Sequence, residues 1–196
     1  GDFGKPGNYF SRQISRWTKQ YQMSETQTID TMNKLIDWLP GNIPDDDANS
    51  IVHGDYRLDN MVLHPEKPEV LAVLDWELST LGHPLGDFTY HLMQWFMPSD
   101  GASTQTLEGA DFDGLNIPDA AEYTRLYCEH TGRDSIENMD FYIAYNMFRL
   151  AGILQGIVGR VRDGTASNEH AALMEDRVKP LSDVGWYYAQ KAGAVG

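Results

Sequence analysis

Apolar positions near the start of the chain recur at helical spacing. Between residues 8 and 22, with cations between them, the apolar side chains are Phe10, Ile14, Trp17 and Tyr21. This spacing predicts an amphipathic helix. A second apolar stripe follows and ends at residue 40. Ser24 with Gln27 three positions later resembles a capping box, so we expect the second helix to begin there.

Between residues 50 and 77 the pattern changes to short aliphatic runs. The runs are SIVHG, NMVLH and PEVLAVLDW. Their β-branched and aliphatic content predicts strands, and the EKPE turn between the last two indicates a small hairpin. Polar residues gather at the ends of these strands, where a site could form.

Helical patterns return after this extended region. Helices are expected from near Pro84, over residues 119–130, over residues 139–162 and from about residue 168 to 191. A loop of more than twenty residues precedes the second of these, and loops of that length are usually functional or mobile. At 196 residues the chain suits one domain or one large lobe. We therefore predict an α+β fold that is mostly helical.

One expected helix contains a nearly uncharged stretch, residues 141–159, which is long enough to cross a bilayer. Arg149 lies at its centre, and a central arginine costs about 2.5 kcal/mol or more on membrane insertion. We therefore expect this helix to be buried in the middle of the protein, and we expect no membrane partner.

Charge and cysteine content narrow the possible partners further. The chain has 15 Lys and Arg against 29 Asp and Glu, a net charge of −14. Binding to nucleic acid or anionic lipid requires clustered positive charge, which a chain this acidic lacks overall. The single cysteine, Cys128, forms no internal disulfide and no multi-cysteine zinc site. A cytoplasmic protein that binds no nucleic acid is expected.

The residues with the clearest chemistry lie in the extended region. Asp55 and Asn60 share one polar loop between strands, and Asp75 ends a later strand. Two carboxylates and a carboxamide can therefore converge across the hairpin. Hard oxygen ligands of this kind suit Mg²⁺, which prefers one or two carboxylates together with substrate phosphates.

The same segment carries a resemblance to a known family. HGDYRLDN is similar to the HRDxxxxN catalytic loop of protein-kinase-like enzymes, in the HGDxxxxN form typical of aminoglycoside phosphotransferases and choline-kinase-like enzymes. LDWE stands where these enzymes carry the metal-binding Asp of the DFG segment, and HPLGD follows. The wider sequence resembles the phosphotransferase-like domain found alone in bacteria or at the head of some large acyl-CoA dehydrogenases.

This resemblance implies a role for each matching residue. Asp55 would be the catalytic base, and Asn60 and Asp75 would bind Mg²⁺ beside ATP. Arg57 either faces the γ-phosphate, as a lysine often does in protein kinases, or is a solvent-facing loop residue. His53 would brace the loop. Asp87 would accept hydrogen bonds from the loop backbone, as an alternative to a charge favoured by the helix dipole.

The resemblance also implies a two-lobed architecture. ATP lies between the lobes, and the smaller N-terminal lobe supplies a phosphate-covering loop, a strand lysine and its glutamate partner. None of these is recognised here, so we expect residues 1–196 to be the C-terminal lobe, with the N-terminal nucleotide-binding lobe absent and the lobe alone inactive.

The expected function is transfer of the γ-phosphoryl group of ATP to a hydroxyl of a small molecule. A CoA-linked hydroxyacyl metabolite fits the dehydrogenase context, with an acyl-CoA dehydrogenase as a fused or neighbouring partner, although the overall charge offers a CoA phosphate no attraction. Tyr142, Asn146 and Arg149 form a polar line on an apolar helix, which either lines the acceptor site or forms an internal hydrogen-bonding stripe.

Two alternatives to a kinase remain open at this point. One is a non-catalytic module that binds nucleotide or metabolite, although the complete set of Asp55, Asn60 and Asp75 argues against it. The other is a metal-dependent hydrolase, which lacks the additional His or Asp ligands that a two-metal site requires.

Overall fold

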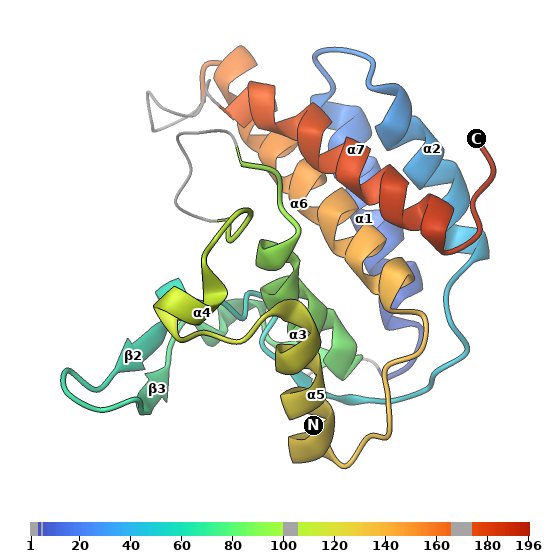
Figure 1. The fold of residues 1–196 in the computed structure, drawn as a ribbon. Helices are drawn as coiled ribbons and strands as arrows, with labels where there is room; N and C mark the ends of the chain where they lie inside the picture. The colour runs from blue at the N-terminus through green and yellow to red at the C-terminus, as the bar shows by residue number, and fades with distance from the viewer. Residues whose placement is uncertain (1–3, 5, 100–105, 166–173) are drawn as a thin grey trace.

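Four helices form the larger part of the core. The computed structural model describes residue 4 and residues 6–99, 106–165 and 174–196. Helix α6 lies in the middle of the bundle and packs against α7 and α1, while α2 packs against α7 (Figure 1). The bounds of the four are α1 (Tyr9–Ser24), α2 (Asp30–Trp38), α6 (Met139–Arg162) and α7 (Glu175–Lys191).

The predicted helices of the bundle are confirmed, but the start of α2 is not where the sequence motif placed it. Ser24 is the last residue of α1, and its hydroxyl donates back to the carbonyl of Gln20 at 2.6 Å. Helix α2 begins only at Asp30, without a side-chain cap. The predicted capping box is therefore wrong, because the Ser24 hydroxyl is already used by the preceding helix.

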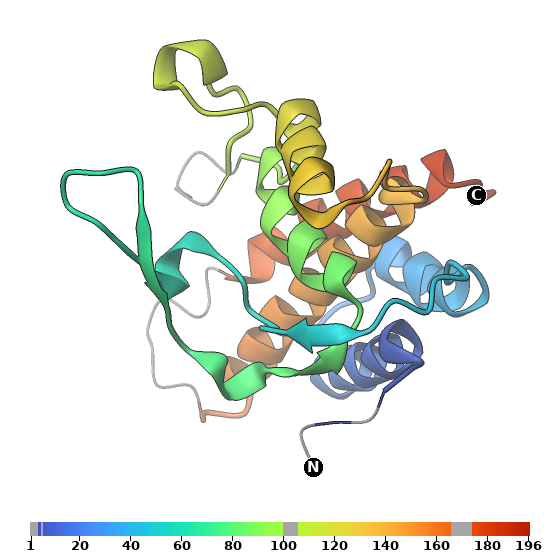
Figure 2. The ribbon, with the colours of Figure 1, turned by 90° about the horizontal axis from the view of Figure 1, so that it is seen from below.

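Four short strands form two separate antiparallel pairs. Strands β2 (Met61–Leu63) and β3 (Val70–Val73) make the expected hairpin, which projects from the helices in both views (Figures 1 and 2). Strand β1 (Ser50–Val52) instead pairs with β4 (Thr80–Gly82), a strand that the sequence analysis did not predict. Three 3₁₀ turns border these strands and the helix that follows: Leu58–Asn60, Trp76–Leu78 and Met93–Trp95.

The remaining helices connect this β region to the bundle. Helix α3 (Pro84–Leu92) begins at the predicted proline and packs against β1 and α6. The predicted long loop contains a one-turn helix, α4 (Phe112–Leu115), and its residues 100–105 lie outside the described part. Helix α5 (Ala120–Thr131) matches its prediction. The expected start of the last helix, near residue 168, also lies outside the described residues.

Helix α6 is the buried central helix that its sequence predicted. Most of its residues from Phe141 to Gly159 are buried, including Arg149. Among the described residues, no helix combines the length and the apolar character that crossing a bilayer requires.

Candidate functional site

The loop between β1 and β2, residues 53–60, brings Asp55 and Asn60 into direct contact. The Asn60 amide Nδ2 donates to the Asp55 carboxylate Oδ2 at 3.1 Å and to the Asp55 carbonyl at 2.9 Å. Asn60 is buried, and its position at the end of a 3₁₀ turn directs it back into the loop. Because one donor group serves both acceptors, the Asp55 carboxylate is fixed in orientation.

Asp75 lies on a second segment that backbone hydrogen bonds tie to this loop. The Leu74 amide donates to the Asn60 carbonyl at 2.8 Å, and the His53 ring nitrogen Nε2 lies 2.7 Å from the Leu74 carbonyl. Asp75 itself has a left-handed backbone conformation, φ 63° and ψ 54°, which few residues other than Gly, Asn and Asp adopt. The segment that carries Asp75 therefore lies beside the loop that carries Asn60, and the convergence of the two side chains on one cation remains a prediction.

Asp87 holds the start of the loop from the first turn of α3. Its two carboxylate oxygens accept hydrogen bonds from the backbone amides of His53 at 2.5 Å and Gly54 at 2.9 Å. Burial raises the pKa of Asp87, while these two hydrogen bonds act in the opposite direction. Gly54 has φ 85°, and a Cβ there would lie 2.7 Å from the Leu78 carbonyl, so this position requires glycine.

Arg149 reaches the same loop from the central helix. Its Nη2 donates to the Gly54 carbonyl, and its guanidinium lies over the ring of Tyr90, 4.5 Å from the centroid. Only 4% of Arg149 is exposed. Asp87 and Arg149 thus bind opposite polar groups of the peptide units at Gly54, one the N–H and the other the C=O, and position the residue before Asp55.

Arg57 lies among the acidic groups of the loop. Its Nε is 3.5 Å from Asp55 Oδ2 and its Nη2 is 3.5 Å from Asp59 Oδ2. About a third of its side chain, 35%, is exposed. Arg57 therefore lies beside the proposed base with part of its surface open to a ligand.

A small cavity opens next to Asp55 on the α3 side. Its volume is about 180 Å³, and its described lining is Arg57, Leu58, Asp59, Tyr90, Met93, Gln94, Met97 and Leu150. The wall combines charged and polar groups with apolar ones, and it includes two methionines, whose flexible thioethers adapt to varied shapes. An apolar part of an acceptor could lie here while its hydroxyl approaches Asp55.

Tyr90 of α3 is a further residue of the site, and the sequence analysis did not single it out. It is buried, and its hydroxyl lies within the electrostatic influence of the Asp55 carboxylate. Burial and then the negative charge of Asp55 raise the pKa of Tyr90 to about 12, against the opposing field of Arg149. The phenol therefore stays protonated at neutral pH beside Asp55. An aromatic residue at helical spacing carries no sign of such a contact in the sequence.

The donor groups of this site fit Mg²⁺. The amide nitrogen of Asn60 is occupied by Asp55, so its oxygen remains to bind a cation. Asp75 is exposed and forms no ion pair with any cation in the described part of the chain. One carboxylate and one carboxamide oxygen suit Mg²⁺, which keeps its other positions for water and phosphate. Among the described residues, no group of three or more His, Cys, Asp or Glu side chains could hold a metal ion by itself. A Mg²⁺ ion here would therefore also need water and phosphate ligands.

The polar line predicted on α6 lies inside the protein. Asn146 is fully buried, and its amide donates to the Thr89 hydroxyl at 2.8 Å. Tyr142 is 1% exposed, and its ring stacks on His83 at a centroid distance of 5.7 Å. These contacts are those of an internal hydrogen-bonding stripe, and of the three residues only Arg149 contacts the loop.

Comparison with known proteins matches the chain to one enzyme family. A model of the phosphotransferase enzyme family matches residues 1–126. A crystal structure from Ralstonia eutropha JMP134, described as a candidate aminoglycoside phosphotransferase, matches with a TM-score of 0.91 at 56% identity, over 97% of this chain and 58% of that one. These matches confirm the resemblance predicted from the loop motif.

Curated relatives place the same segment in larger proteins. The chain is 44% identical to acyl-CoA dehydrogenase family member 10 of Mus musculus, over 97% of this chain and 18% of that protein. It is 40% identical to acyl-CoA dehydrogenase family member 11 of Homo sapiens, over 93% of this chain and 24% of that protein. The chain thus spans about a fifth of the length of the curated relatives it matches, which suggests fusion to a dehydrogenase in those proteins.

Proposed function

The chain belongs to the phosphotransferase enzyme family, and we propose that it is the catalytic and acceptor-binding lobe of a kinase that phosphorylates a hydroxyl of a small molecule. The observation that carries the proposal is the Asp55 carboxylate held by Asn60 at 3.1 Å, with Asp75 on the segment bonded to the same loop. Phosphoryl transfer depends mainly on positioning and on neutralising charge, and this arrangement supplies groups for both.

In this proposal each residue acts on a stated group. Asp55 accepts the proton of the acceptor hydroxyl and directs its oxygen, while Asn60 fixes the carboxylate. Arg57 lies where it can bind the transferred phosphoryl group. Asn60 and Asp75 hold Mg²⁺, which when bound neutralises the phosphate oxygens of ATP. His53, Asp87 and Arg149 position the loop and touch no reacting atom.

An exposed apolar face supports a second lobe over this site. Nine large apolar residues of the β region are 39–62% exposed: Ile51, Leu58, Val62, Leu63, Val70, Leu71, Leu74, Trp76 and Leu78. Large apolar side chains exposed in one region of the chain favour an interaction there. The chain covers only 58% of its bacterial structural neighbour, so we propose that a nucleotide-binding lobe packs on this face and completes the ATP site.

The acceptor follows from the cavity and from the relatives. Met93, Met97 and Leu150 form one part of the cavity beside Asp55, and they offer contacts for an apolar chain of an acceptor. The two relatives are named as members of the acyl-CoA dehydrogenase family. We therefore propose a hydroxyacyl group carried on CoA as the acceptor and ATP with Mg²⁺ as the donor.

The test replaces the proposed base in the two-lobed protein. Asp55→Asn keeps the size of the side chain, and loss of a general base lowers the rate by about 10²–10⁴-fold. The measurement is Mg²⁺-dependent phosphorylation of hydroxyacyl-CoA, with folding checked by thermal unfolding. The matched control is Asp37→Asn, an exposed residue of α2 with the same change in charge. Turnover of Asp55→Asn equal to that of the control would refute the assignment.

A non-catalytic binding module is the second candidate. Such a module would bind Mg·ATP or acyl-CoA and consume no ATP with any hydroxylated metabolite tested. The hydrogen bond from Asn60 to Asp55 favours the kinase, because a binding module has no need to orient a carboxylate with a buried amide.

A further inference from the structure

A groove between α1 and the C-terminal half of α6 concentrates positive charge on this acidic chain. Its volume is about 690 Å³. Five of the 15 Lys and Arg residues line it, namely Arg12, Arg16, Lys19, Arg160 and Arg162. Asp163 is the one carboxylate among its described lining residues. The groove therefore carries local positive charge, in contrast to the net charge of −14.

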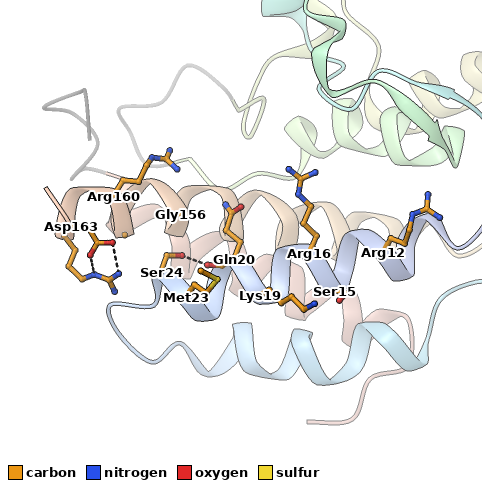
Figure 3. Close-up of a pocket in the computed structure, with 12 residues that line it drawn as sticks. Arg12, Ser15, Arg16, Lys19, Gln20, Met23, Ser24, Gly156, Arg160 and Asp163 are labelled. Carbon is orange, nitrogen blue, oxygen red and sulfur yellow. Dashed lines mark hydrogen bonds and ion pairs between the residues drawn. The ribbon is translucent and has the colours of Figure 1, made fainter. Parts of the chain in front are cut away.

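Three of these cations have no acidic partner among the residues that the structure describes. Arg162 is paired with Asp163 at 2.8 Å, but no carboxylate in the described part of the chain forms an ion pair with Arg16, Lys19 or Arg160. Arg16 and Arg160 project to the same side of the α1–α6 pair (Figure 3). Two unpaired guanidinium groups facing one side form a surface for an anion.

Close packing of the two helices forms the floor of the groove. A Cβ at Gly159 would lie 2.5 Å from Ser24 Cβ and 3.1 Å from Ser24 Cα, and one at Gly156 would lie 2.5 Å from Gln20 Nε2. Gln20 donates to the Gly152 carbonyl at 3.4 Å. Because these glycines have no side chain, α1 packs directly on α6. The long cationic side chains of the two helices border the surface where they meet.

Trp17 links Arg16 of the groove to the proposed catalytic loop. The ring of Trp17 lies beside two guanidinium groups, Arg16 at 5.1 Å and Arg149 at 5.8 Å from its centroid. Arg149 in turn binds the Gly54 carbonyl, next to Asp55. Arg160 follows Arg149 by three helical turns on nearly the same face of α6, about 16 Å along the axis. The cations therefore extend from the region of the loop toward the far end of α6.

We propose that this groove binds the phosphate groups of a long, carrier-linked acceptor whose hydroxyl reaches Asp55. The inference rests on the proposed function and deepens it, because it assigns a binding site to the part of the acceptor that does not react. Guanidinium groups bind phosphate through paired, charge-assisted hydrogen bonds. An anionic polymer longer than the groove would meet the acidic remainder of the surface, so the size of the basic region favours a small ligand.

The separation of the groups sets the shape of the ligand. A compact acceptor with its hydroxyl at Asp55 could not reach Arg160, because about three turns of helix lie between Arg149 and Arg160. An extended acceptor with its phosphates at one end and its hydroxyl at the other could contact both. Coenzyme A is the probe that matches this description, and pantetheine is its counterpart without phosphate.

The test measures binding of both probes to the two-lobed protein by calorimetry. The nucleotide site is filled beforehand with Mg²⁺ and a non-hydrolysable ATP analogue, so that coenzyme A cannot bind there. The double variant Arg16→Gln with Arg160→Gln should bind coenzyme A about 100-fold more weakly, about tenfold for each lost charge-assisted contact. Binding of pantetheine should change by no more than about twofold, because pantetheine has no phosphate for these groups to bind.

A matched variant controls for net charge. Arg125→Gln with Lys179→Gln removes two cations from exposed positions on α5 and α7, each paired there with carboxylates, and should leave binding of coenzyme A within about twofold. Unchanged binding in the groove variant, or an equal loss in this control, overturns the inference.

Kinetics distinguish this inference from the proposed function. With hydroxyacyl-CoA as acceptor, the groove variant should raise the acceptor KM and leave kcat nearly unchanged, whereas Asp55→Asn should lower kcat and leave binding of coenzyme A intact. Loss of turnover in Asp55→Asn with an unchanged KM in the groove variant overturns the groove and leaves the kinase. Charge-dependent binding of coenzyme A without any ATP-dependent turnover supports the groove and overturns the kinase.

Discussion

Asp87 provides the sharpest test of how the fold positions the proposed base. Asp87→Asn preserves the size of the side chain but replaces one of its two acceptor oxygens with an amide. The carboxylate accepts from the His53 amide at 2.5 Å and from the Gly54 amide at 2.9 Å. One of these N–H groups would then face an NH₂ group, which cannot accept a hydrogen bond.

The magnitude follows from the two contacts. A buried donor without an acceptor costs about 1–3 kcal/mol. The second contact changes from a charged to a neutral acceptor and loses about 1 kcal/mol. Burial of the charged carboxylate is itself unfavourable and raises the pKa of Asp87. The neutral asparagine avoids this cost, which offsets part of the loss. We expect a net loss of about 2 kcal/mol in the free energy of unfolding, or a urea midpoint lower by roughly 1 M.

Urea unfolding and steady-state kinetics together check this expectation. Because Asp87 holds His53 and Gly54 next to Asp55, the two-lobed variant should lose kcat while its KM for ATP changes little. The matched control is Asp134→Asn, which makes the same change in charge at an exposed position and should stay within about 0.5 kcal/mol of wild type. A stability within that range for Asp87→Asn, with unchanged kcat, would show that these hydrogen bonds do not position the loop.

Three further predictions address the metal site, a buried histidine and the helix contact. Asp75→Asn keeps a residue that tolerates φ 63°, so stability should hold within about 0.5 kcal/mol while Mg²⁺-dependent turnover is lost; retained turnover would contradict the ligand role. Burial lowers the pKa of His91, so the unfolded state binds more protons just below pH 6.5 and stability should fall as the pH drops from 7 to 5. His91→Gln should reduce that fall in urea midpoint, and an unchanged slope would refute it. Gly159→Ala brings a Cβ to 2.5 Å from Ser24 Cβ and should destabilise the protein by about 1 kcal/mol, whereas Gly152→Ala, with its Cβ 3.6 Å from the Trp17 carbonyl, should not.

The helical part of the fold could be predicted because its apolar pattern continues over many residues. The expected range of α6 agrees with Met139–Arg162 as observed, since apolar residues on all sides require burial. Strand β4 and its pairing with β1 could not be predicted in this way. Three residues are too few for an alternating pattern, and their partner lies about thirty positions earlier. The Ser24 motif failed for a similar reason, because a local pattern does not show which neighbouring helix uses the hydroxyl.

The site residues divide in the same manner. Asp55, Asn60 and Asp75 could be placed near one another from their spacing around strands, and the backbone bond from Leu74 to Asn60 agrees with that. The position of Tyr90 near Asp55 could not be foreseen, because it depends on how α3 docks against the loop. The catalytic roles of all four remain predictions for the kinetic tests above.

The basic groove shows why net charge is a weak guide to small ligands. A charge of −14 spread over 196 residues argues against binding of a long polyanion, because such a ligand would contact much of the surface. Electrostatic interactions in salt decay over about 8 Å, so a small phosphate group responds mainly to the charges within that distance. Arg16 and Arg160 are placed by two helices more than a hundred residues apart in the chain, and neither lies in a run of basic sequence. Raising the ionic strength should therefore weaken binding of coenzyme A but not of pantetheine, and equal salt dependence for both would mean that the phosphates do not bind these arginines.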